Sequence, residues 1–187
     1  MKLIAAQFVK PYVKSNKNDR ADAEAICEAV TRPSMRFVPK KSLQQQDIQT
    51  IHRVRGRLIK QRTALVNQIR GLLGEYGLIM AQGVAALRRQ LPLYLEDASN
   101  ELTPVSREVF ADLYEHLLTV DEQIKVYDQK IRILVKNTDA CQRLLDVPGI
   151  GPIVATALVM ALGDAQVFKN GRHMAAYLGL VPRQHSS

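Results

Sequence analysis

The sequence has few cysteines and no long apolar segment. Its two cysteines, Cys27 and Cys141, lie far apart, with no CxxC pair, so neither a zinc site nor a disulfide framework is indicated. A reducing cytoplasm fits this composition. The apolar run at the N-terminus is too short for a signal peptide, and no later run approaches a membrane span. We therefore expect a soluble protein with no membrane partner. The histidines show no metal-ligand spacing, and we expect surface or hydrogen-bonded roles for His52, His116, His173 and His185.

Acidic residues are scarce in the first part of the chain. Residues 1–76 contain 15 lysines and arginines against 6 acids, whereas residues 77–187 contain 11 against 12. The formal net charge of +8 therefore comes from the N-terminal part. Such a local excess favours nucleic acid or another anionic surface as partner, although a solvated basic face would have the same composition. The length of 187 residues allows one ordinary domain or two small ones.

The opening segment predicts a small α/β element. Residues 2–13 have the composition of a β-strand and the segment that leaves it, and a helix is predicted from about Asp19 to Val30. Pro33 and Pro39 break the chain before the next helix. A lone strand and helix cannot bury their own apolar faces. We therefore interpret residues 1–42 as a piece of a larger α/β unit.

Two long helices are predicted in the middle of the chain. Residues 43–76 contain no proline, and apolar residues recur every seven positions. Arg55 and Arg62 interrupt this apolar stripe, so they need acidic partners or solvent. A second helix is predicted from about Val105 to Lys136, with a stripe formed by Val109, Leu113, Leu117, Val120, Ile124, Tyr127, Ile131 and Leu134. We expect antiparallel pairing within residues 43–138, either as an ordinary bundle or as a coiled coil that also joins copies of the chain.

The most specific motif is a turn within LLDVPGIGPIVATALVMAL, residues 144–162. A Pro-Gly-Ile-Gly turn between two apolar helices is a helix-hairpin-helix signature. Gly149 and Gly151 permit a tight turn whose backbone N–H groups can hold a phosphate without reading base sequence. Alternatively, the hairpin only packs against a neighbour, because the turn has no basic residue and Asp146 adjoins it. The candidate DNA-binding residues here are Pro148, Gly149, Ile150 and Gly151. Three later glycines are expected to end short helices: Gly163, Gly171 and Gly179.

Two carboxylates lie within the basic N-terminal part. Asp19 and Asp22 are three positions apart and share one face of the predicted helix. The basic residues around them suit a nucleic-acid backbone that crosses the site. The alternative is a pair of acids that favour the macrodipole at a helix N-terminus. The candidate DNA-binding residues of this part are Lys14, Lys17, Arg20, Arg53, Arg57 and Lys60.

These stretches resemble transposases of the insertion-sequence 110 family over essentially the whole chain. The resemblance is carried by FVKPYVKSNKNDRADAEAI, by the two long helices and by the final segment from LLDVPGIG to QHSS. It implies an RNase H-like domain with a DEDD acidic quartet, then a coiled coil and a transposase domain with a nucleophilic serine. Asp19 and Asp22 match the last two acids of the quartet, which implies that they bind Mg²⁺. Ser186 and Ser187 match the start of the family's Ser-Ser-Gly stretch, and Ser187 is the expected nucleophile.

The match to the family pattern is partial at both ends. The first two acids of the quartet precede the strand at which this chain begins, and the glycine and basic tail after the serines are absent. We therefore expect a fragment that binds Mg²⁺ weakly, because the ion needs ligands from several elements. The resemblance also implies a guide RNA encoded beside the gene and a nucleoid-associated protein of the bacterial cytoplasm.

The sequence therefore predicts a mainly α fold in three parts. These are a remnant of an RNase H-like α/β domain at 1–42, a long antiparallel coiled-coil hairpin at 43–138 and an incomplete helix-hairpin-helix transposase domain at 139–187. The expected function is that of a transposase, in DNA binding, strand cleavage and strand exchange, with a homo-oligomer formed through the coiled coil. The alternative is a non-catalytic nucleic-acid-binding coiled-coil module.

Overall fold

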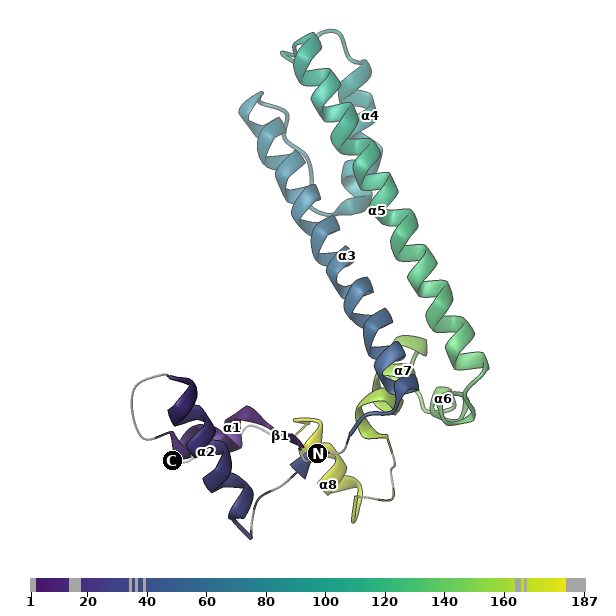
Figure 1. The fold of residues 1–187 in the computed structure, drawn as a ribbon. Coiled ribbons are helices and arrows are strands. Elements are labelled where there is room, and N and C mark those ends of the chain that lie inside the picture. Colours follow the sequence, from purple (N-terminus) through teal and green to yellow (C-terminus); the bar gives the residue numbers. More distant parts are fainter. Residues whose placement is uncertain are drawn as a thin grey trace, which may run out of the picture. The chain divides into compact units, whose positions relative to one another are not determined.

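A computed structural model describes residues 3–13, 18–33, 35, 37–38, 40–163, 166 and 168–180 of the chain. The fold is mainly helical, as predicted (Figure 1). The chain divides into two compact units, Met1–Gln44 and Gln45–Ser187. Within the described ranges, no helix has the length and apolar character that crossing a membrane requires.

The first unit contains two very short strands and three helical segments between them. β1 (Leu3–Ile4) pairs antiparallel with β2 (Phe37–Val38). The intervening segments are α1 (Ala6–Val9), the 3₁₀ turn η1 (Lys10–Tyr12) and α2 (Asp19–Thr31). The predicted strand over residues 2–13 is therefore wrong beyond Ile4. Pro11 lies in the first turn of η1, where its fixed φ suits a helix. The N–H groups of a first turn have no acceptor within the helix, so proline removes no hydrogen bond there.

The first unit buries little apolar surface. Ala25 and Ala29 are the fully buried hydrophobic side chains of α2. Larger apolar side chains stay exposed, namely Leu3, Phe8, Val13, Ile26, Val30 and Phe37. An open groove of about 660 Å³, lined mainly by apolar residues of β1, α1 and α2, also includes Lys10 and Asp22. An isolated strand and helix were expected to leave their apolar faces uncovered in this way.

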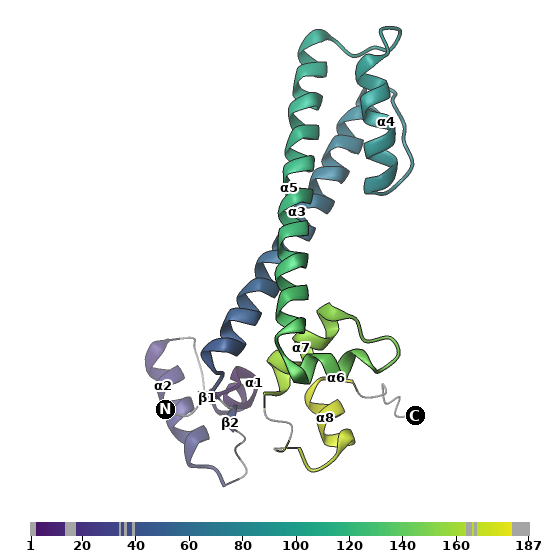
Figure 2. The same cartoon turned by 90° about the vertical axis from the view of Figure 1, so that its right-hand side faces the viewer.

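Two helices of 33 residues each dominate the second unit. These are α3 (Leu43–Glu75) and α5 (Pro104–Lys136), and both agree closely with the predicted ranges. Ion pairs join Arg55 to Asp128 and Arg62 to Asp121. The arginine that comes later in α3 thus pairs with the aspartate that comes earlier in α5. The two helices are therefore antiparallel, and they cross in the view of Figure 2.

A third helix, α4 (Val84–Glu96), has no counterpart among the predicted helices. Pro92 lies inside α4 and cannot donate a hydrogen bond to the carbonyl of Arg88, one turn earlier. The Tyr114 hydroxyl of α5 donates to that carbonyl at 3.4 Å and replaces the missing amide. Leu87 and Leu91 are fully buried, so tertiary packing stabilises the helix despite its proline.

The main core lies where α3, α4 and α5 meet. Its buried members are Leu65, Val66, Ile69, Leu73, Met80, Leu87, Leu91, Leu102, Phe110 and Leu117. Tyr76 meets Phe110 edge to face, with 6.0 Å between the ring centres. Further along the pair, a smaller cluster joins Leu58 of α3 to Val120 and Ile124 of α5. Burial follows most of the predicted stripe of α5, but Val109 is exposed and Phe110 is buried in its place.

Three short helices follow α5. These are α6 (Asp139–Leu145), α7 (Pro152–Leu162) and α8 (Gly171–Tyr177). Val135, Cys141 and Ala155 form a small core between α5, α6 and α7, and burial raises the pKa of the Cys141 thiol. Gly163 and Gly179 follow α7 and α8 with positive φ, as expected for helix ends. The expectation for Gly171 was wrong, because it is the first residue of α8 after the Asn170 cap.

Candidate nucleic-acid interface

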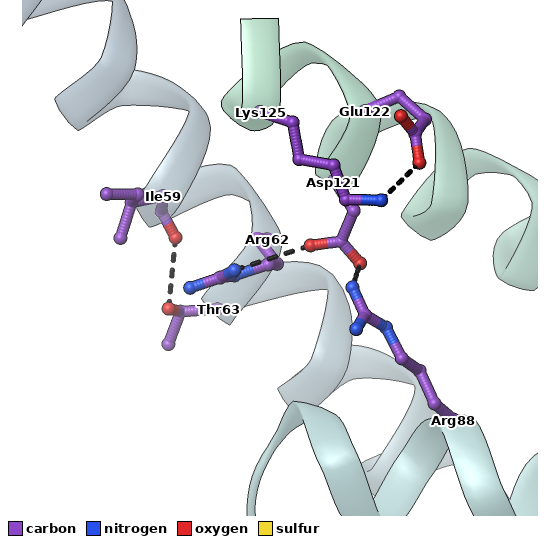
Figure 3. Close-up of polar contacts among 7 residues, drawn as sticks. All are labelled: Ile59, Arg62, Thr63, Arg88, Asp121, Glu122 and Lys125. Carbon is purple, nitrogen blue, oxygen red and sulfur yellow. Dashed lines mark hydrogen bonds and ion pairs between the residues drawn. The ribbon is translucent and has the colours of Figure 1, made fainter. Parts of the chain in front are cut away.

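The arginines of α3 are divided between two faces of the helix, and the inner face points to α5. The Arg55 guanidinium pairs with Asp128 at 2.5 Å, and Arg62 pairs with Asp121 at 3.3 Å. Asp121 is only 5% exposed and also accepts a hydrogen bond from Arg88 of α4, as Figure 3 shows. Of the two expected alternatives for Arg55 and Arg62, acidic partners or solvent, the structure shows acidic partners. These two arginines hold the helices together and are not available to a ligand.

The outer face of α3 carries three basic residues, Arg53, Arg57 and Lys60, here called the basic row. All three are exposed, and their spacing of four and three residues places them on one face over about 10 Å of helix. No member of the basic row has an ion-pair or hydrogen-bond partner among the residues that the structure describes. The row is therefore a concentrated and uncompensated positive charge.

A glycine interrupts the helix surface beside the basic row. Gly56 lies three residues after Arg53 and four before Lys60, so it borders the same face. Apart from the adjacent backbone of α3, no described heavy atom lies within 4 Å of a Cβ added to Gly56. Packing among the described residues therefore does not require glycine at this position. The sequence prediction did not include Gly56, although a glycine in the middle of a proline-free helical stretch was a visible signal.

The two carboxylates of the predicted metal site lie in the first turn of α2. Asp19 and Asp22 are both exposed, and Asn18 caps the helix by accepting a hydrogen bond from the Ala21 amide at 2.7 Å. Arg20 pairs with Glu24 on the same helix at 3.4 Å. Acids in a first helical turn are stabilised by the macrodipole, so this geometry accounts for their presence without a ligand. Lys14 and Lys17 lie outside the described residues.

The fit of a magnesium ion can be tested on these residues. Carboxylate oxygens suit Mg²⁺, but the ion demands near-octahedral coordination from several groups. Among the side chains that the structure describes, no group of three or more histidines, cysteines, aspartates or glutamates is placed to hold a metal ion. The described part of the chain therefore does not complete a magnesium site. The predicted nucleophiles Ser186 and Ser187 lie outside it.

The turn between α6 and α7 combines open backbone with apolar side chains. Gly149 has φ of +87°, which favours glycine, whereas Gly151 has extended backbone that any residue adopts. The amide of Ile150 donates to the carbonyl of Val147 at 3.1 Å, and its side chain packs on the core of α5, α6 and α7. Within the described part of the chain, the amides of Gly149 and Gly151 have no acceptor. Gly149 is exposed and Gly151 is half-buried, so the turn presents two amide donors that lack an acceptor among the described residues.

A histidine links α3 to α7 beside the basic row. The Nε2 atom of His52 lies 2.9 Å from the hydroxyl of Thr156, which is fully buried. The Thr156 hydroxyl donates to the carbonyl of Pro152 at 2.9 Å, so its oxygen accepts a hydrogen bond from the Nε2–H group of His52. Burial, and then the charge of Arg55, lower the pKa of His52. The prediction of a hydrogen-bonded histidine is confirmed here, but no sequence signal identifies Thr156 as its partner.

Comparison with known proteins gives two matching family models. A model of DEDD transposases of the IS110 group, described as a transposase, matches residues 2–78, and the model of the transposase IS116/IS110/IS902 family matches residues 141–187. The chain belongs to this family of insertion-sequence transposases. No solved structure matches the chain.

Several curated relatives match over nearly the full chain. The transposase for insertion sequence element IS1111A of Coxiella burnetii is 49% identical over 185 residues, which are 99% of this chain and 51% of the relative. A probable family 20 transposase of Pseudomonas aeruginosa is 50% identical over 188 residues, with 100% of this chain and 56% of the relative covered. A pilin gene-inverting protein of Moraxella bovis is 43% identical over 44 residues, or 24% of this chain and 14% of that protein. Nearly the whole of this chain matches these two transposases, but it spans only about half of their length.

Proposed function

We propose that this chain is a DNA-binding part of an insertion-sequence transposase and that it holds the phosphate backbone through the basic row of α3. The supporting observation is the division of basic residues on that helix. Arg55 and Arg62 are neutralised by acids of α5, whereas the basic row is exposed and unpaired among the described residues. Phosphates that approach the row release counterions, which favours binding regardless of base sequence.

The α6–α7 turn supplies a second backbone contact in this proposal. The free amides of Gly149 and Gly151 adjoin the N-terminus of α7, whose partial positive charge favours a phosphate oxygen. Asp146 opposes such a contact by charge, so the turn adds less than the basic row. The contact would be to a phosphate and would carry no sequence information.

Strand cleavage is the reaction that the family membership suggests for the complete enzyme. The hydroxyl oxygen of Ser187 would form a bond to phosphorus as the bond between phosphorus and a deoxyribose oxygen breaks. The serine proton would leave, and the displaced deoxyribose oxygen would take one up. The resulting phosphoserine link preserves the bond energy for rejoining. Asp19 and Asp22 would serve in the acidic site, and a guide RNA and a second copy of the chain would complete the assembly.

DNA binding is tested by fluorescence anisotropy with a labelled DNA duplex over a range of salt concentrations. The variant Arg53→Gln/Arg57→Gln/Lys60→Gln removes up to three phosphate contacts, so the slope of log affinity against log salt should become shallower by roughly three units. The matched control, Lys125→Gln/Arg132→Gln/Lys136→Gln, removes the same charge from exposed positions of α5. Equal losses in both variants would contradict a specific role for the basic row.

Cleavage is tested by incubating the 187-residue chain with Mg²⁺ and a matching DNA substrate. We expect no covalent protein–DNA adduct, because the described residues do not complete a metal site and weakened positioning costs orders of magnitude in rate. In a longer member of the family that does form the adduct, alanine at the serine equivalent to Ser187 should abolish it. An adduct formed by the 187-residue chain would contradict this expectation, because it would show that Asp19 and Asp22 are the only acids that cleavage needs.

A further inference from the structure

Beyond the charged side chains, the helix backbone itself is accessible beside the basic row. Glycine inside a helix is about 1 kcal/mol less favourable than alanine, because it loses more backbone freedom on folding. Gly56 lies in the interior of α3, far from either end. Its φ is not positive, and apart from the adjacent backbone of α3 no described heavy atom lies within 4 Å of the position that a Cβ would occupy. Neither a turn nor close packing within the described chain offsets the cost of this glycine.

Close approach of a partner to the helix is one physical reason for glycine at such a position, and the cations beside Gly56 suit an anionic partner. Gly56 is flanked on the helix surface by Arg53 and Lys60, one turn before and one turn after it. Both flanking side chains are exposed and Gly56 is half-buried, so the missing Cβ leaves less bulk on the helix surface between them. A phosphate seated there would meet a cation on each side and would be closer to both than a methyl group allows.

We propose that the sugar–phosphate backbone of a nucleic-acid duplex crosses α3 at Gly56, in direct contact with the helix backbone between Arg53 and Lys60. This inference rests on the proposed function, since it assigns a close-approach position to the same basic row. It adds a steric requirement that charge alone does not impose. Side chains at position 56 should weaken binding in order of size, with no change in net charge.

Two substitutions test this requirement because both favour the helix. Gly56→Ala and Gly56→Leu place good helix formers into open space, so the melting temperature should rise by roughly 2–4 °C. Affinity for a duplex should nevertheless fall, by a few-fold for alanine and by about tenfold or more for leucine. A protein that is more stable and binds less tightly cannot be explained by damage to the fold.

The matched control is Gly74, which lies in the same helix and also has no described heavy atom within 4 Å of an added Cβ, apart from the adjacent helix backbone. It is 18 residues from Gly56, or about 27 Å along the helix axis, and therefore beyond the basic row. Gly74→Leu should raise the melting temperature and leave affinity unchanged. DNA and RNA duplexes of one sequence, measured in parallel, show which sugar–phosphate backbone is held.

The results separate this inference from the proposed function. If the glutamine variant of the basic row loses affinity while Gly56→Leu binds as tightly as the wild type, the close approach at Gly56 is wrong and the role of the basic row stands. If the glutamine variant also binds normally, the proposed function is wrong. If Gly56→Leu and Gly74→Leu lose affinity equally, position 56 has no special role and the inference is again overturned.

Discussion

At the scale of single residues, the burial of His52 beside Arg55 should make stability depend on pH. The pKa of His52 is lowered in the folded protein from its ordinary value of about 6.5, first by burial and then by Arg55. The unfolded chain therefore takes up a proton first as the pH falls. The stabilising contribution should be complete above about pH 6.5 and should be lost as the pH drops from there to the lower pKa of the folded state.

Thermal unfolding measured between pH 8 and pH 5 checks this prediction. His52→Gln removes the titrating group, so the melting temperature of the variant should change less over this interval. At pH 8 the variant should be less stable by about 1 kcal/mol, the net value of one hydrogen bond. His116→Gln is a control, since His116 is exposed and contacts Gln61 at the surface. An unchanged pH profile in His52→Gln would contradict the assignment.

Asp121 is the residue whose loss should cost most. Its side chain is 5% exposed and holds Arg62 from α3 and Arg88 from α4. Asp121→Asn leaves both arginines without an acid, and breaking a buried ion pair costs about 3–5 kcal/mol. The arginines are 29% and 42% exposed, so water offsets part of this cost and we expect the lower end of that range. Urea unfolding measures the difference in the free energy of unfolding. A decrease below 1 kcal/mol would show that water solvates both arginines in the variant.

At the scale of elements, α4 depends on one arginine of the next helix. The Arg107 guanidinium donates to the carbonyls of Tyr94, Leu95 and Asp97 and to the side chain of Asn100. It thus occupies the C-terminal end of α4, where the last carbonyls lack helical partners and the macrodipole favours a cation.

Lysine cannot reproduce this planar set of donors, so Arg107→Lys should destabilise the protein by about 2 kcal/mol. Hydrogen exchange of the α4 amides should accelerate first, because the change frays the end of that helix. Arg132→Lys is the matched control on the same helix, since Arg132 is exposed and has no ion pair within the described part of the chain. Equal exchange of α4 in both variants would argue against the capping role.

The elements also show what the sequence could predict. The stripes of α3 and α5 repeat over many turns without proline, so both helices were found nearly to the residue. Asp121 and Asp128 lie far along the chain from Arg62 and Arg55, so only the need for acidic partners was predictable. At Pro92 the rule that proline interrupts a helix did not hold, because Tyr114 of another helix supplies the missing hydrogen bond. At residues 6–12 the apolar composition suggested a strand, although a helical turn with Pro11 was equally compatible with it.

At the scale of the molecule, we predict that copies of the chain associate through the outer side of α5. Val126 and Ile133 are exposed and seven positions apart, so they lie on one face of that helix. Light scattering at high protein concentration should show a mass above 21.0 kDa. Val126→Ser/Ile133→Ser should reduce that mass, whereas Leu93→Ser, at an exposed position of α4, should not. A monomer at all concentrations would exclude this association.

The Arg107 contacts have a consequence for the order in which the chain folds. They join residues that are 5 to 13 positions apart, whereas Arg55 and Asp128 are separated by 73 positions. Loops of about ten residues close in about 10–100 ns, so the corner between α4 and α5 can form as soon as Arg107 is available. During synthesis, however, α3 is complete well before the acids of α5 have been made. In that interval Arg55 and Arg62 are as uncompensated as the basic row, and the nascent chain is more cationic than the finished protein.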